Sequence, residues 1–263
     1  LKHEYKPKRY GGNDMPLSPK TLRNHWVVFS GFFRWVSREF EIENIMSDVP
    51  APKFKKKPVV PFEREEIQAI LKACSYSREV TPIDRSKFAM KRGTAKRDQA
   101  IIMTLLDTGM RAQELCSLKI GSVDIKSGQV IIEHGLSGGA KGGKGRVVFL
   151  GKQTRKAVWR YLTSREDRKD AEAPVFLGTR GYAMTPNALR QLIVSLASRA
   201  GVSGATTHRF RHTMAITYLR SGGDIFTLQA LLGHSSLDMV RHYANIASID
   251  VKQAHRKASP VDN

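Results

Sequence analysis

Residues 207–245 read THRFRHTMAITYLRSGGDIFTLQALLGHSSLDMVRHYAN, and this stretch decides the fold of the C-terminal part of the chain. Its pattern of apolar and polar residues predicts helices over 207–221, 224–231 and 236–246. Gly233 and His234 fall in the turn before the last of these helices, for which Ser235 or Ser236 offers an N-cap. The stretch is therefore predicted to form three consecutive helices.

The first of these helices carries a cluster of cationic and imidazole side chains. His208 and Arg211 are three residues apart on one helical face, and His212 follows His208 by one turn. The residues alone leave three interpretations open: a metal-binding pair, a structural histidine, or a pair that clamps a phosphate. A metal is disfavoured, because HExxH is absent and no third ligand is near. Tyr243, nine residues after His234, is by position alone an ordinary core or interface residue.

The charge of the chain points to a polyanionic partner. Lys and Arg total 44 against 24 acidic residues, a formal net charge of +20, while the hydrophobic content is an ordinary 41%. The excess is about +6 over residues 1–57 (12 basic, 6 acidic) and +14 over the rest, so it is not confined to one tail. Nucleic acid is the leading candidate. A membrane is disfavoured, because no apolar run approaches the roughly 18 residues that a spanning helix needs.

The cysteines and the start of the chain suggest an intracellular protein. Cys74 and Cys116 lie in apolar helical patterns, which predicts buried free thiols rather than a disulfide or metal site. The sequence opens at Leu1 in a charged run without a signal peptide. We therefore expect a cytoplasmic, nucleoid-associated protein trimmed at its N-terminus.

The N-terminal part predicts one long helix and a linker. Ser18 and Pro19 offer a helix start, and an apolar stripe follows at intervals of three and four. The stripe comprises Leu22, Trp26, Phe29, Phe33 and Val36. PAPKFKKKPVVP, residues 50–61, predicts an extended linker that is either a solvated charge run or a basic strap along DNA. The expected DNA contacts are Lys55, Lys56, Lys57, Arg34, Lys91 and Arg92, the last two from the long basic connector before residue 96.

The middle of the chain predicts helices around one small antiparallel sheet. Helices are expected over 63–75, 96–107, 111–118, 153–165 and 186–200, with Gly109 ending the second and Arg111 opening the third. GQVIIEH and GRVVFL flank a glycine-rich turn that carries Lys141 and Lys144. That turn is not a Walker A loop, because Gly145 replaces the Ser or Thr and a strand follows. The fold class is mainly α with a small antiparallel β-sheet (α+β).

Arg111 and Glu114 lie three residues apart on one face of the third predicted helix. A cation at a helix N-terminus opposes the macrodipole, which is tolerable where an anion such as phosphate binds between them. The plain alternative is a surface pair worth a few tenths of a kcal/mol. Both interpretations hold if Glu114 positions Arg111 for an anion.

Five motifs occur in order: TGMRAQEL, AKGGKGR, THRFRHT, LLGHSS and the tyrosine nine residues after His234. Over roughly residues 60–250 they resemble the tyrosine recombinase, or phage integrase, family. The resemblance implies two phosphate-binding arginines, two active-site histidines, a hairpin lysine, a supporting acid and a nucleophile. In this sequence they are Arg111 and Arg211, His208 and His234, Lys141, Glu114 and Tyr243. Lys144 is the alternative hairpin lysine, because Arg111 and Lys141 are widely spaced, and His212 is a further supporting residue.

The resemblance also implies an architecture and an activity. Residues 58–263 are expected to form a catalytic domain with a C-terminal tail, after a partial helical core-binding domain over 1–57. The implied function is that of a site-specific recombinase or integrase of a phage or mobile element. It acts on specific sites in double-stranded DNA through a 3′-phosphotyrosyl intermediate, without metal, ATP or other cofactor. The implied assembly is a homotetramer on synapsed DNA, with residues 249–263 docking on a neighbour and with room for an accessory DNA-bending protein. The alternatives are a type IB topoisomerase and a non-catalytic basic DNA-binding protein.

Overall fold

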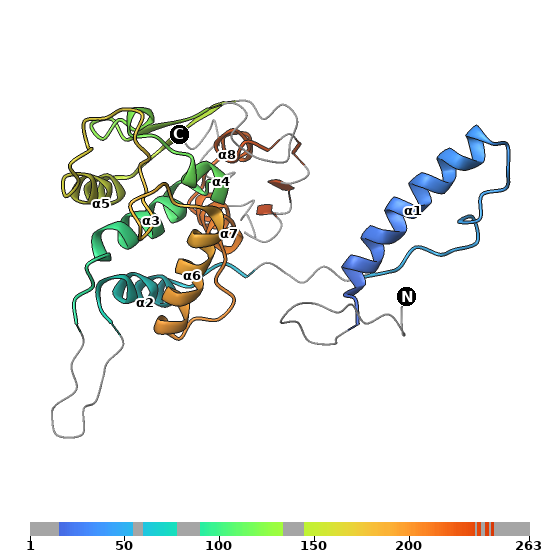
Figure 1. Cartoon of the computed structure of the whole chain (residues 1–263), viewed down its shortest axis with the longest axis horizontal. Coiled ribbons are helices and arrows are strands. Elements are labelled where there is room, and N and C mark those ends of the chain that lie inside the picture. Colours follow the sequence, from blue (N-terminus) through green and yellow to red (C-terminus); the bar gives the residue numbers. More distant parts are fainter. Residues whose placement is uncertain are drawn as a thin grey trace, which may run out of the picture. The chain divides into compact units, whose positions relative to one another are not determined.

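The computed structural model describes residues 16–54, 60–77, 90–133 and 145–234, together with residues 236, 237, 240, 241, 243 and 244. The chain divides into two compact units, Leu1–Pro58 and Val59–Asn263 (Figure 1). Each unit is described by itself.

The first unit is built on one long helix, α1 (Pro19–Glu39). Its start is the predicted one: the Ser18 hydroxyl accepts a hydrogen bond from the backbone N–H of Thr21, and Pro19 occupies the first turn. The indole of Trp26 donates to the carbonyl of Val49, so the segment after α1 runs back along the helix. The predicted apolar stripe is only partly covered, and Phe29 is exposed.

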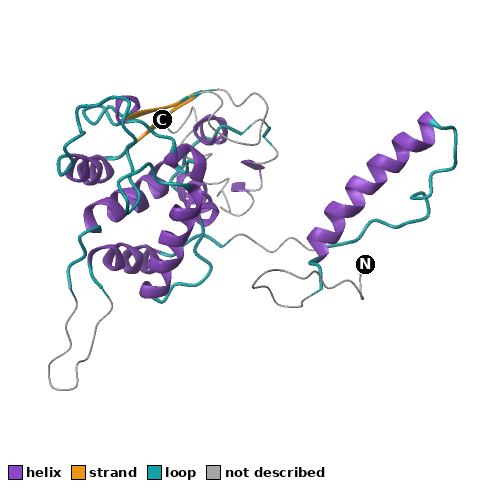
Figure 2. Cartoon of the chain, viewed as in Figure 1, coloured by secondary structure: helices purple, strands orange, loops and turns teal. Residues whose placement is uncertain are grey.

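The second unit is mainly helical with one small sheet (Figure 2). Its elements in chain order are α2 (Arg64–Ser75), α3 (Ala95–Thr108), α4 (Ala112–Cys116), the short 3₁₀ helix η1 (Ile120–Ser122), β1 (Gln129–Ile132), β2 (Arg146–Phe149), α5 (Lys152–Leu162), α6 (Pro186–Ala200), α7 (Thr207–Arg220) and α8 (Ile225–Leu232). The predicted fold class is thus confirmed. None of the described helices combines the length and the apolar character needed to cross a bilayer.

Helix α3 forms the centre of this unit, where it packs against α2, α5 and α7. Strands β1 and β2 pair antiparallel, with Val130 opposite Val148 on the buried face and Ile131 opposite Val147 on the exposed face. The alternation of side chains along a strand therefore places Arg146 on the same face as buried Val148. A second buried cluster joins α7 and α8 to Val240 and Tyr243.

The helix ends follow the capping residues. Gly109 ends α3 with a left-handed φ of 60°, as predicted, and Gly233 ends α8 in the same way with a φ of 63°. Arg111 is the N-cap of α4 rather than its first helical residue. Within the predicted helix over 236–246, the structure describes residues 240, 241, 243 and 244 as helical.

The start of the second unit is fixed to α7 by Arg209. Its guanidinium donates to the carbonyls of Val60 and Pro61, pairs with Glu66 at 2.6 Å, and stacks 4.0 Å from the centre of the Phe62 ring. The first residues of this unit are therefore attached to the helix that carries His208 and Arg211.

Backbone contacts join the two ends of the basic connector after α2. The N–H of Ser77 donates to the carbonyl of Met90, and Tyr76 bridges Lys91, whose side chain is exposed. Arg92 instead pairs with buried Asp98 at 2.8 Å. The geometry thus gives Arg92 a structural partner, while Lys91 faces solvent. Residues 78–89, between these ends, lie outside the described residues.

Candidate active site

Arg211 is the most buried cation of the candidate site. It projects from α7 and is only 5% exposed. One terminal nitrogen donates to the carbonyl of Gly109 at 2.8 Å, and the other lies 2.7 Å from both the carbonyl of Leu232 and the Nε2 atom of His234. Burial, followed by the charge of Arg111, lowers the pKa of Arg211 to about 10. The guanidinium therefore remains charged at neutral pH and joins the ends of α3 and α8.

Arg111, the N-cap of α4, reaches the same place from another element. Its Nη1 donates to Glu114 at 3.0 Å, and its Nη2 donates to the carbonyl of Gly233 at 3.3 Å. The side chain is still 35% exposed. Arg111 is thus held in orientation while part of its guanidinium faces outward, as binding of an anion requires.

Glu114 is the buried carboxylate that orders these cations, and its side chain is 1% exposed. Oε1 accepts from Arg111 at 3.0 Å and Arg146 at 2.8 Å, and Oε2 accepts from the Arg111 backbone and Arg146, both at 2.7 Å. Burial alone would raise the pKa of Glu114, but the hydrogen bonds and charge of Arg146, then the backbone and side-chain hydrogen bonds of Arg111, hold that pKa at about 2. Glu114 is therefore an anion at every physiological pH.

Arg146 is a site residue that the sequence interpretation missed. It opens β2, its side chain is 10% exposed, and its Nε donates to the carbonyl of Leu231 at 2.7 Å. The sequence did contain a signal for it: Arg146 lies two residues before the apolar Val148 in a predicted strand. Side chains two residues apart share one face of a strand, so Arg146 points inward, where its charge needs a partner.

His234 follows directly on the left-handed Gly233 and is 8% exposed. Burial, then the charges of Arg211, Arg111 and Arg146, lowers the pKa of His234 to about 4. The imidazole is therefore neutral at pH 7. Because Arg211 can only donate, Nε2 of His234 accepts and Nδ1 carries the proton.

Tyr243 packs against His234 and lies close to Arg211. It is 5% exposed, stacks on His234 with ring centres 6.2 Å apart, and lies 5.3 Å from the ring of His212. Burial raises the pKa of Tyr243, and the charge and a side-chain hydrogen bond of Arg211 oppose that rise. The phenol is thus protonated at neutral pH and lies close to Arg211, the most buried cation of the candidate site.

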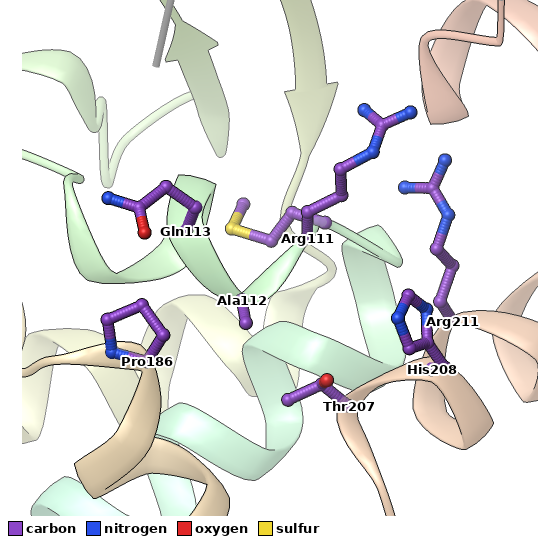
Figure 3. A pocket seen from close by; sticks show the side chains of 8 residues that line it. Arg111, Ala112, Gln113, Pro186, Thr207, His208 and Arg211 are labelled. Atoms are coloured by element: carbon purple, nitrogen blue, oxygen red, sulfur yellow. The ribbon is translucent and has the colours of Figure 1, made fainter. Parts of the chain in front are cut away.

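An open cavity of about 260 Å³ gives access to the arginines. It is lined by Met110, Arg111, Ala112, Gln113, Pro186, Thr207, His208 and Arg211. In Figure 3, Arg111 and Arg211 extend their guanidinium groups in the same direction, and the His208 ring lies beside the Arg211 side chain. His208 itself is exposed. The cavity therefore presents two cations and one imidazole to an incoming ligand.

The remaining predicted residues have different places. Arg34 is exposed on α1 of the first unit. The hairpin lysines Lys141 and Lys144, the linker lysines Lys55, Lys56 and Lys57, and the tail 249–263 lie outside the described residues. Cys74 and Cys116 are buried free thiols, as predicted. Across the described ranges, no three His, Cys, Asp or Glu side chains lie close enough together to hold a metal ion.

Comparison with known proteins identifies the family. The family described as Phage integrase family matches residues 62–248. Tyrosine recombinase XerC of Corynebacterium efficiens is 34% identical over 165 residues, 63% of this chain but only 51% of its own length. Tyrosine recombinase XerC of Bacillus pumilus is 30% identical over 252 residues, 93% of this chain and 76% of its own length.

A solved structure agrees at the level of the fold. The Tn1549 transposon integrase, in complex with transposon right end DNA, is 21% identical with a TM-score of 0.69, over 86% of this chain and 75% of its own. The chain spans about half the length of the Corynebacterium efficiens XerC that it matches. The family match, in turn, covers most of the second unit of this chain. The chain belongs to the phage integrase family.

Proposed function

We propose that this chain is a site-specific DNA recombinase that cleaves and rejoins DNA strands, with Tyr243 as the nucleophile. The observation that carries the proposal is the convergence of Arg111, Arg211, His234 and Tyr243, from separate elements, beside a cavity that opens to solvent. A phenol without nearby cations would be an ordinary core residue. Here it lies against a buried guanidinium that has a second guanidinium next to it.

The charge of the cluster suits a reacting phosphodiester. Three guanidinium groups, from Arg111, Arg146 and Arg211, surround the single carboxylate of Glu114, which leaves a net charge of +2. A phosphodiester carries one negative charge, and a second develops on its oxygens as the nucleophile attacks. Cations fixed in a partly dry site stabilise that added charge more than water does.

The proposed reaction has two steps of the same chemistry. The Oη of Tyr243 forms a bond to phosphorus as the bond from phosphorus to the 5′-oxygen breaks, and the phenolic proton passes to a base. A general acid protonates the departing 5′-oxygen, a role that the family resemblance gives to Lys141. Each proton transfer contributes about 10² to 10⁴ in rate. The 5′-hydroxyl of a partner strand then reverses the step, so that the energy of the phosphodiester is retained and no ATP is needed.

His234 contributes hydrogen bonds rather than charge in this scheme. His234 is neutral at pH 7, and its buried Nδ1 has no hydrogen-bond partner among the described residues. A buried donor without a partner is unusual in a folded protein, and a bound phosphate oxygen would supply the partner. His208, which is exposed and lines the cavity with Arg211, is proposed to contact the same phosphate.

Double-stranded DNA is the proposed partner, and the net charge of +20 supports it. The transposon integrase of similar fold was solved with transposon right end DNA, which supports a mobile element or phage as the source of this chain. By the same family resemblance we propose a homotetramer on synapsed sites, with or without a DNA-bending accessory protein, in the bacterial nucleoid. The first unit, with exposed Arg34 on α1, and the linker lysines are proposed to contact the DNA backbone.

A covalent-capture assay tests this function and identifies the DNA site in the same experiment. The chain is incubated with a pool of duplexes of random sequence, each with a nick near the centre so that a cleaved strand loses its short 5′-hydroxyl fragment and cannot be rejoined. Adducts that survive denaturation with detergent are the expected result, and sequencing them defines the site. Retained DNA without adducts would point to a binding protein. Relaxation of supercoiled DNA without exchange between two sites would point to a topoisomerase.

A further inference from the structure

Among the described residues, Arg146 connects strand β2 to the phosphate site. It begins β2, directly after residue 145, where the described chain resumes; Lys141 and Lys144 precede it outside the described residues. Its side chain is 10% exposed and uses all three guanidinium nitrogens in hydrogen bonds. Three of its five N–H donors are thus engaged by Glu114 and Leu231.

The two ends of the guanidinium contact two different parts of the site. Its two terminal nitrogens bind both oxygens of Glu114 at 2.8 and 2.7 Å, and its Nε binds the carbonyl of Leu231 at 2.7 Å. Glu114 in turn orients Arg111, and Leu231 lies in the last turn of α8 just before Gly233 and His234. Arg146 thus reaches both phosphate-binding elements at once.

Gly233 shows how closely these groups are packed. A Cβ added to Gly233 would lie 3.0 Å from Nη1 of Arg146, while the carbonyl of Gly233 accepts a hydrogen bond from Arg111. The turn that presents His234 is therefore shaped around the two arginines. A lysine at position 146 would keep the charge but lose the planar fork that binds both oxygens of Glu114.

We infer that Arg146 is a positioning residue that aligns the hairpin with Arg111 and His234, and that it acts on the phosphate through Glu114. This inference rests on the proposed function of the site. A purely structural arginine would affect the stability of the fold alone. A positioning arginine changes the rate of strand cleavage and the protonation of Glu114 as well.

The variants are R146K, which keeps the charge, and R146M, which removes it. A matched control is R165K, because Arg165 also binds both carboxylate oxygens of one residue, Asp167, and donates to the carbonyls of Pro174 and Val175 away from the site. The substrate is the nicked duplex of the captured sequence, and the readout is the rate of adduct formation. Thermal melting and DNA affinity by fluorescence anisotropy are measured in parallel.

We expect R146K to slow adduct formation by about tenfold or more, as loss of charge-assisted hydrogen bonds to one acceptor predicts, with DNA affinity changed less than about threefold. R165K lowers the melting temperature but leaves the cleavage rate of the remaining folded protein unchanged. Absence of adducts with the parent chain would overturn the proposed function together with this inference. Equal adduct rates for the parent, R146K and R165K would overturn the inference alone.

A double-mutant cycle with E114Q separates positioning from mere stability. If Arg146 acts through Glu114, R146M slows cleavage much less in the E114Q variant than in the parent. Full additivity of the two effects would contradict this.

The pH profile gives a second readout. The charged groups facing Glu114 are Arg111 on its own helix, Arg146 from β2 and Arg211 from α7. In R146M the hydrogen bonds and charge of Arg146 no longer oppose burial, so the pKa of Glu114 rises from about 2, and cleavage falls more steeply than in the parent as the pH is lowered toward 4.5. The E114Q/R146M variant lacks this fall. An R146M profile parallel to that of the parent would overturn the inference.

Discussion

Replacing Glu114 with Gln should strongly destabilise the second unit, and the loss should depend on pH. The folded-state pKa of about 2, against the ordinary 4.5, corresponds to about 3 kcal/mol of stability at neutral pH. The amide of Gln has one acceptor oxygen, so its NH₂ group must replace either Oε1 or Oε2 of Glu114. At the Oε2 position the NH₂ group faces the Arg111 backbone N–H and Arg146, and at the Oε1 position it faces the Arg111 side chain and Arg146. Breaking one partner of a buried ion pair costs about 3 to 5 kcal/mol, which agrees with that figure.

Urea unfolding from pH 7 down to pH 3 measures this loss. The pKa of Glu114 is depressed in the folded state, so its stabilisation is fully present above pH 4.5 and is lost as the pH falls toward 2. The difference between parent and E114Q should therefore be widest near pH 7 and should narrow steadily below pH 4.5. E172Q is the control, because Glu172 forms a largely exposed pair with Lys119 and should change neither the stability nor its pH dependence. A pH-independent difference, or one below about 1 kcal/mol at pH 7, would refute the assignment of Glu114 as a buried anion.

Three further outcomes are expected. Tyr243→Phe keeps the ring stacked on His234, so unfolding experiments should find a loss within about 1.5 kcal/mol, while no adduct forms in the capture assay; a surviving adduct would exclude Tyr243 as nucleophile. Gly233→Ala should lower the free energy of unfolding by about 1 to 2 kcal/mol for its left-handed φ, and by a further amount for the contact with Arg146. Gly201→Ala, at a φ of 69° with open space around it, should show only the backbone cost. Equal losses of stability in urea would argue against close packing at Gly233. Arg209→Met removes three carbonyl bonds and an ion pair, so a loss of about 2 to 4 kcal/mol is expected in the same assay; a change below about 0.5 kcal/mol would show that the start of the second unit is not held by this side chain.

Local rules explain why most elements were predictable. Ser18 with Pro19, Thr185 with Pro186, and Gly109 mark helix ends through hydrogen bonds within a few residues. The start of α1 and both bounds of α3 and α6 therefore follow from the sequence to within one or two positions. The two strands were likewise visible as short β-rich runs on either side of a glycine-rich turn.

The contacts that build the site were not predictable in the same way. Arg146 pairs with Glu114 across 32 residues and with Leu231 across 85, distances at which no periodic pattern carries information. Arg92 pairs with the buried carboxylate of Asp98, a contact that its place in a run of basic residues did not indicate. The motif order located the residues that meet, but the fold was needed to show which groups hold them.

The residue to which DNA becomes attached distinguishes Tyr243 from every other nucleophile of the chain. A captured adduct is digested with nuclease and trypsin, and the peptide that retains a nucleotide is sequenced by mass spectrometry. Our account predicts the peptide of residues 242–252, HYANIASIDVK, with the nucleotide joined through its 3′-phosphate to Tyr243. Attachment to another residue, or through a 5′-phosphate, would contradict it.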